Sequence, residues 1–175
     1  IQNFVFFFRN FNEMQKNKLR LALYQPEIAL NVGSIIRLCS CFKIDLDIIE
    51  PCGFPFSVKA LKRSSLDYYK TCNINKYLNY ENFFQTRISN FKNNINKSKL
   101  ILMSTKGQKT LWDYNFTSND IILMGNESSG VSKEVHSDAD EVLKIPISDE
   151  CRSLNVSISA GISVAEALRQ LSNEN

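Results

Sequence analysis

Short apolar segments of strand length alternate along this chain with longer segments whose apolar residues recur at helical spacing, and this alternation constrains the fold most. Strands are predicted at residues 19–24, 45–50, 99–105, 120–124 and 141–147. Helices are predicted at residues 31–42, 57–69, 80–93 and 153–171. Strands that alternate with helices are typical of an α/β fold, with a mostly parallel sheet and helices on both of its faces.

The continuity of this pattern indicates a single domain. No repeat, low-complexity tract or linker interrupts the 175 residues, and a chain of this length buries a substantial core. We therefore expect one domain over residues 19–172. Residues 1–18 are expected to be an N-terminal extension with little role in the fold.

Composition limits the possible functions only loosely. The formal net charge of +3 permits a polyanionic partner without demanding one. The five cysteines form no CxxC pair, and the one histidine, His136, cannot complete a zinc site with them, so no metal is expected. The apolar run Phe4–Phe8 is far shorter than the ~20 residues that a membrane span needs. We expect a cytoplasmic protein with reduced thiols and no membrane segment.

Three loops rich in small and polar residues follow predicted strands: residues 104–107, 125–130 and 148–157. Ligands of parallel sheets bind beyond the carboxyl ends of the strands, so these loops are the predicted site. Glu127 would repel a phosphate, and neither a GxxxxGK[ST] nor a GxGxxG motif is present. A phosphate-binding loop is therefore disfavoured, whereas a purely structural turn stays open. A serine hydrolase is also disfavoured, because no GxSxG elbow is present and His136 lies in a polar, exposed-looking segment.

Two predicted helices carry polar residues near their starts. Asn31 is the predicted cap of the first helix, and Arg37, among apolar neighbours, is expected to be half-buried beside an anion. That anion is either an internal carboxylate or a phosphate or developing oxyanion. Ser153 and Asn155 lie in the predicted first turn of the last helix, where they can cap it or bind the edge of a nucleobase or ribose.

A group of cations is predicted on one face of the helix at 57–69, comprising Lys59, Lys62 and Arg63. Such a group is often a solvated surface. Lys106 and Lys109, beside the third predicted strand, would extend it into a patch for an RNA backbone.

Three segments, in this order, resemble the three motifs of the SpoU-like SPOUT RNA 2′-O-methyltransferases: NVGSIIR, ILMGNESSGV and IPISDECRSLNVSISAGI. Each motif alone is weakly specific, but together they occur in the family's order on the expected elements. The segments YQPEIALNVGSIIRLC, IIEPCGFPF and RSSLDYY look closer still to the tRNA (cytidine/uridine-34) 2′-O-methyltransferase subfamily. The resemblance extends from about Leu19 to Leu171.

This resemblance implies an α/β fold with a C-terminal trefoil knot, a homodimer with its sites at the interface, a tRNA substrate and S-adenosyl-L-methionine as the cofactor. Knots are rare among folds, and nothing in the residue pattern alone indicates this one. By the same resemblance, the cofactor lies in a cleft formed by Met103, Ser104, Gly125, Ile145, Ser153 and Leu154.

The resemblance also assigns catalytic roles to Arg37, Glu127 and Asn155. The guanidinium group of an arginine keeps its proton at neutral pH and therefore does not readily accept another as a base. Arg37 is instead expected to stabilise a developing alkoxide and hold a phosphate. Glu127 is expected to orient Arg37 or Asn155. RNA-binding roles are implied for Asn31, Lys62, Arg63 and Arg152.

The chain departs from the subfamily's pattern at Ala165, where the subfamily often has tyrosine. If that tyrosine holds RNA in the subfamily, the contacts of this chain with its substrate differ. Two alternatives stay open. The target nucleotide can be another tRNA position or lie in ribosomal RNA, or the chain can be a non-catalytic RNA-binding module on the same scaffold. An intact set of Arg37, Glu127, Ser153 and Asn155 argues against the module.

Overall fold

The computed structural model of the protein describes residues 19–57, 61, 65, 67–92 and 98–172. The strands are β1 (Arg20–Tyr24), β2 (Asp45–Ile49), β3 (Ile74–Tyr77), β4 (Leu100–Met103), β5 (Lys109–Thr110), β6 (Ile121–Met124) and β7 (Glu141–Lys144). The α-helices are α2 (Ala29–Phe42), α4 (Tyr80–Lys92), α5 (Lys133–Asp138) and α6 (Val156–Leu171), with 3-10 turns η1 (Tyr68–Lys70) and η2 (Leu111–Asp113).

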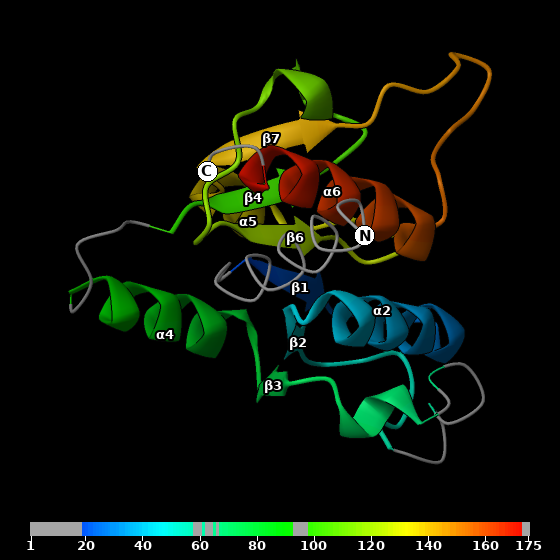
Figure 1. Cartoon of the computed structure of the whole chain (residues 1–175), viewed down its shortest axis with the longest axis vertical. Coiled ribbons are helices and arrows are strands. Elements are labelled where there is room, and N and C mark those ends of the chain that lie inside the picture. The colour runs from blue at the N-terminus through cyan, green and yellow to red at the C-terminus, as the bar shows by residue number, and fades with distance from the viewer. Residues whose placement is uncertain (1–18, 58–60, 62–64, 66, 93–97, 173–175) are drawn as a thin grey trace, which may run out of the picture.

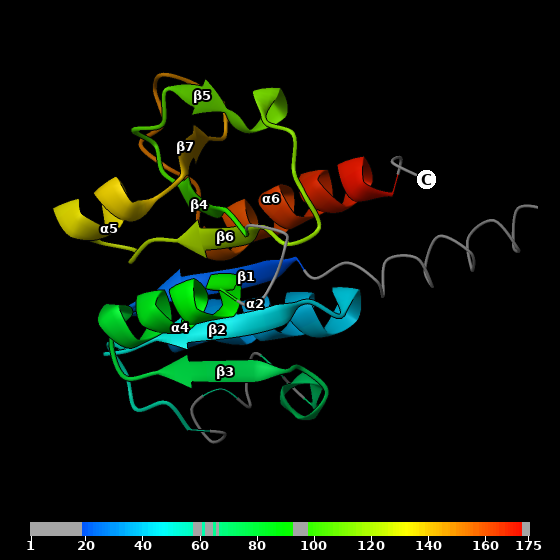
Figure 2. The same ribbon diagram turned by 90° about the vertical axis from the view of Figure 1, so that its left-hand side faces the viewer.

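The seven strands form one sheet in the order β3-β2-β1-β6-β4-β7-β5, and each neighbouring pair is parallel. Figure 2 shows this order from edge to edge. The central strands are continuous apolar runs, such as IILM in β6, because the strands of a parallel sheet are covered on both faces. The prediction of an α/β fold with a mostly parallel sheet is confirmed.

Alternate residues of each strand face two separate helical layers. Leu21 and Leu23 of β1 belong to a core cluster with residues of α2 and α6. Ala22 and Tyr24 of the same strand belong to a second cluster with residues of α4 and α5. The four helices therefore cover both faces of the sheet, two on each face (Figures 1 and 2).

The sequence prediction missed three short elements, β3, β5 and α5. It also proposed a continuous helix over residues 57–69, which is wrong at its carboxyl end because residues 68–70 form the 3-10 turn η1. The Leu61 N–H does donate to the Ser57 carbonyl, as in a first helical turn. Residues 1–18, Lys59, Lys62 and Arg63 lie outside the described residues, so the predictions made for them stay predictions.

Within the described ranges, no helix is long and apolar enough to cross a membrane. The same residues contain no group of three or more histidine, cysteine, aspartate or glutamate side chains placed to hold a metal ion.

A buried ion pair joins the central strands β1 and β2. Arg20 Nη2 lies 2.5 Å from Asp47 Oδ2, whose side chain is fully buried. Asn75 Nδ2 donates to the other carboxylate oxygen at 3.0 Å. Burial raises the pKa of Asp47, and Arg20 opposes that shift.

The Arg20→Met variant is expected to lose about 3 kcal/mol of unfolding free energy near neutral pH, because Asp47 is left buried without its cation. Without Arg20 the pKa of Asp47 rises further, so the folded state binds this proton more tightly than the unfolded chain does. Stability then falls as the pH increases above about 4, the ordinary range of an aspartate. Urea unfolding at about pH 5 and about pH 7 measures the deficit, and a deficit of equal size at both values would contradict this account.

Candidate active site

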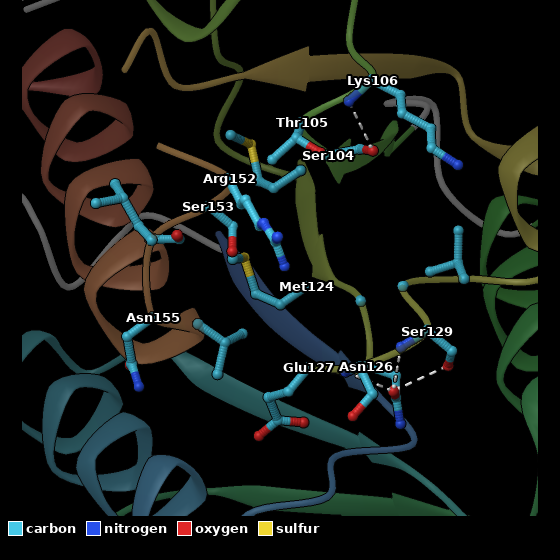
Figure 3. Close-up of a pocket in the computed structure, with 18 of the residues that line it drawn as sticks. Ser104, Thr105, Lys106, Met124, Asn126, Glu127, Ser129, Arg152, Ser153 and Asn155 are labelled. Carbon is cyan, nitrogen blue, oxygen red and sulfur yellow. Dashed lines mark hydrogen bonds between the residues drawn. The ribbon is translucent and has the colours of Figure 1, made fainter. Parts of the chain in front are cut away.

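The carboxyl ends of β4, β6 and β7 and the start of α6 surround a cavity of about 600 Å³ (Figure 3). It lies where ligands of parallel sheets bind. The three loops predicted from the sequence all contribute to its lining. So do the six residues implied for the cofactor, which are Met103, Ser104, Gly125, Ile145, Ser153 and Leu154.

The loop after β6 is a tight turn closed on itself. The N–H groups of Asn126 and Gly130 each donate to the other residue's carbonyl oxygen, at 2.8 and 2.9 Å. Gly130 has a φ of 70°, a conformation that favours glycine. A Cβ at Gly125 would lie only 3.0 Å from the Gly130 carbonyl carbon. Glycine is therefore favoured at both ends of the turn.

The carboxylate of Glu127 projects from this turn onto the start of α2. Its Oε2 accepts from the Glu27 N–H at 2.8 Å, and its Oε1 accepts from the Ile28 N–H at 3.3 Å. Ile28, at the N-cap position of α2, makes no side-chain capping bond. Glu127 thus supplies, from a distant loop, the negative charge and acceptor oxygens that a helix start needs. This arrangement explains why a carboxylate occupies the loop.

Glu127 also begins a chain of side-chain hydrogen bonds through all three motif segments. Asn31 Nδ2 donates to Glu127 Oε1 at 3.0 Å, and Asn155 Nδ2 donates to Asn31 Oδ1 at 3.0 Å. Asn155 Oδ1 then accepts from the Ser157 N–H at 2.8 Å and caps α6. The chain fixes the start of α2, the loop after β6 and the start of α6 relative to one another.

These contacts correct three details of the sequence prediction. Asn31 does not cap its helix, because α2 begins at Ala29 and Asn31 lies inside it, only 8% exposed. Ser153 is not in the first turn of α6, which begins at Val156 after its cap Asn155. The hydrogen-bond partners of Glu127 are Asn31 and two backbone amides, so this carboxylate reaches Asn155 only through Asn31.

Asn155 allows its two roles to be separated by mutation. Asn155→Asp keeps an oxygen that caps α6 but loses the amide donor to Asn31, so we expect near-normal thermal stability and about tenfold lower catalytic efficiency. Asn155→Ala loses the cap as well and is expected to cost about 1 kcal/mol of stability in addition. Thermal unfolding and methyl-transfer kinetics of the two variants test this, and equal stability losses in both would contradict the assignment.

Arg37 lies outside the lining of this cavity. Its side chain is exposed, which contradicts the prediction that it is half-buried. The buried face of α2 carries Asn31, Ile35, Ile36 and Cys39, among others, and Arg37 lies off that face. The Arg37 Cζ lies 5.3 Å from the centre of the Tyr68 ring. Arg152, in contrast, lines the cavity, and its RNA-binding role stays a prediction.

Some lining residues were not found from the sequence. His136 of α5 is exposed, as its polar segment indicated, but the sequence did not predict that it lines the cavity. Asn126 organises the turn after β6, because its Oδ1 accepts from the N–H groups of Ser128 and Ser129. The hydroxyl of Ser128 donates to Glu27 and lowers the pKa of that carboxyl. A polar residue beside a glycine was the only signal for Asn126, and it did not specify this role.

The chain belongs to the SpoU rRNA methylase family, whose model matches residues 18–165. It is 39% identical over 151 residues to a tRNA (cytidine(34)-2′-O)-methyltransferase of Beijerinckia indica, covering 86% of this chain and 91% of that protein. It is 32% identical over 155 residues to the tRNA (cytidine(34)-2′-O)-methyltransferase of Escherichia coli K12, covering 87% and 94%.

Solved structures agree with this assignment. One that concerns the 2-OH methylation of C/U34 on tRNA superposes with a TM-score of 0.81 at 32% identity, covering 90% of this chain and 99% of that one. The SpoU methyltransferase AviRb from Streptomyces viridochromogenes, in complex with AdoMet, has a TM-score of 0.79 at 22% identity, covering 88% and 61%. At that identity it shows the shared fold alone.

Proposed function

We propose that this protein transfers a methyl group from S-adenosyl-L-methionine to the ribose 2′-hydroxyl of nucleotide 34, a cytidine or uridine, of tRNA in the cytoplasm. The relatives named for this reaction are 32–39% identical to the chain over most of their length. The observation that carries the proposal is the Glu127–Asn31–Asn155 chain, which joins the three motif segments at one cavity.

The cavity suits a nucleoside-containing cofactor. Its volume of about 600 Å³ is in the range of ligand pockets. Apolar side chains of Met103, Ile145 and Leu154 lie there with the hydroxyls of Ser104 and Ser153. Such a mixture provides flat apolar contact for a base and hydrogen bonds for its edge and for a ribose. When bound, the cofactor supplies an electrophilic methyl group on a sulfonium.

The protein's own part in the reaction is to position the 2′-hydroxyl and favour loss of its proton. Glu127 is fully engaged with Asn31 and the start of α2, so its role is positioning. Cationic groups then stabilise the developing alkoxide and hold the neighbouring phosphates. We assign the phosphates to Arg152, which lines the cavity, and the alkoxide to Arg37.

We further propose that two copies of the chain assemble. One apolar row of α6, containing Ala160, Val164 and Ala167, is buried within the chain. The other row leaves Ile158 54% exposed, and exposed Leu154 precedes it. The start of the adjacent α2 adds exposed Ile28 and Leu30. Exposed apolar side chains on two helices that pack against each other indicate a protein interface. Contact at this surface would bring the exposed Arg37 of one copy towards the other copy's cavity.

The trefoil knot is part of the same proposal. It is supported by the return of the chain after β7, where residues 145–155 lead into α6, which packs against β6 and α2 (Figure 1).

The proposed function is tested by incubating the protein with methyl-labelled S-adenosyl-L-methionine and unmodified bulk tRNA, and mapping the product by its resistance to alkaline cleavage. Methylation at position 34 is the expected result. Methylation at another tRNA position or only in ribosomal RNA would retain the chemistry and reject the target. Cofactor binding without transfer to any RNA would favour the non-catalytic module.

A further inference from the structure

Three lysines and one exposed tryptophan lie on the segments around β4 and β5, and β5 is the last strand of the sheet (Figure 2). We call Lys99, Lys106, Lys109 and Trp112 the β5 edge strip. Lys109 Nζ lies 5.1 Å from the centre of the Tyr114 ring, and Lys99 Nζ lies 5.7 Å from the same centre. Two ammonium groups therefore converge on one buried ring.

Nearby carboxylates neutralise this strip only partly. Glu141 is 3.9 Å from Lys109 Nζ, a long and half-exposed pairing that contributes little. Asp140 is engaged by Arg87 and by the Leu100 N–H. Asp113 accepts the Thr110 hydroxyl, and Asp120 accepts the Tyr114 hydroxyl. Hydroxyl donors leave the negative charges of Asp113 and Asp120 in place, so the strip keeps positive charge chiefly at Lys106 and Lys109. Lys106 is exposed and has no ion pair among the described residues, and the pairing of Lys109 with Glu141 is long.

Trp112 is held outward by a fixed turn. Its side chain is 52% exposed, whereas Leu111 before it is fully buried and Tyr114 after it is 2% exposed. Gln170 of α6 donates to the Tyr114 carbonyl at 2.9 Å and ties the turn to the core. The buried neighbours Leu111 and Tyr114 therefore hold the turn in place and keep the indole ring of Trp112 exposed. A rigid exposed aromatic ring beside cations is the arrangement on which single-stranded nucleic acids stack their bases.

The strip is continuous with the cavity through Lys106. This residue lines the cavity beside Ser104, and its N–H donates to the Ser104 hydroxyl at 3.2 Å (Figure 3). Gly107, next along the chain, packs so closely on β7 that an added Cβ would lie 2.6 Å from the Leu143 carbonyl carbon. The turn between the cavity and β5 is therefore pinned, and the cations that follow it have a fixed position relative to the cavity.

We propose that the β5 edge strip binds the RNA strand next to the methylated nucleotide, with its lysines on phosphates and Trp112 stacked on a base. This inference rests on the proposed function, because it takes the RNA to be the substrate held at the cavity. The occupant is an RNA strand rather than a protein, because exposed Lys106 and weakly paired Lys109 lie with one flat exposed ring on a segment that continues into the cavity.

The test compares Lys109→Gln and Trp112→Ala with the wild-type protein. The control is Lys70→Gln, an exposed lysine of η1, which leads into β3 at the opposite edge of the sheet. We expect Trp112→Ala to raise the KM for tRNA about tenfold, with kcat and cofactor affinity unchanged. Lys109→Gln is expected to raise it severalfold and to reduce the slope of log affinity against log salt by roughly one, as for a lost phosphate contact.

Wild-type KM and salt slope in both strip variants would overturn the proposal, as would equal effects in Lys70→Gln. A wild-type protein that methylates no tRNA would contradict the proposed function instead. In that case the affinity of the same variants for bulk tRNA, measured by fluorescence anisotropy, still decides whether the strip binds RNA.

Discussion

Glu127→Gln is expected to lower kcat/KM for methyl transfer by about 100-fold, although it changes only one oxygen to an amide nitrogen. Both carboxylate oxygens accept hydrogen bonds, one from the Glu27 N–H and the other from the Ile28 N–H and Asn31. A glutamine must turn an NH2 group towards one of these donors. Each lost bond to the charged group is worth about 1.5–3 kcal/mol, and the start of α2 then moves relative to the cavity.

Glu27→Gln is the matched control, because it makes the same chemical change one loop away. Glu27 is partly exposed, and its carboxylate accepts a surface hydrogen bond from Ser128 without reaching Asn31 or Asn155. We expect its kcat/KM to stay within about threefold of the wild type, since an exposed interaction contributes little. Asn31→Ala added to Glu127→Gln should cost little more, because both residues belong to one chain of bonds. Wild-type kinetics in Glu127→Gln would contradict the role assigned to this carboxylate.

Most strands that the sequence predicted are buried on both faces of the sheet. Strands such as LILM of β4 are wholly buried, so their sequences are continuous apolar runs without alternating polar residues. The missed strands lie at the two edges of the sheet. β3 (INKY) has no fully buried residue, and β5 has only two residues, so neither carries a clear apolar period. Their pairing with a neighbouring strand defines them, and that pairing is a tertiary property.

The candidate site was also only partly predictable: its local turns and caps could be read from the sequence, but its long-range contacts could not. The glycine-bounded loop and the polar start of the last helix were visible locally, because turns and caps use characteristic residues. The partner of Glu127 was not visible, since Asn31 lies 96 residues earlier in the chain. Arg37 was placed wrongly because apolar neighbours in a helix indicate burial only for residues on the same face, and Arg37 lies off the buried face of α2.

Arg37→Ala is expected to lower kcat by about two to three orders of magnitude, the range for loss of one group that stabilises a developing oxyanion. The affinity for S-adenosyl-L-methionine should stay unchanged, because Arg37 does not line the cavity. Isothermal titration with the cofactor and single-turnover kinetics with tRNA separate the two effects. Its exposed position makes a fold defect a poor explanation for lost activity, and thermal unfolding checks this directly.

If the chain forms the proposed dimer, a mixed dimer decides which cavity Arg37 serves. One chain carries Arg37→Ala and the other carries Glu127→Gln, and two different affinity tags isolate the mixed species. If Arg37 acts on the partner's cavity, one of the two sites combines an intact Glu127 with an intact Arg37, and about half of the wild-type activity returns. If it acts within its own chain, each site holds one defect and the mixed dimer is as inactive as its parents. Because Arg37 is exposed and outside the cavity of its own chain, we expect the activity to return.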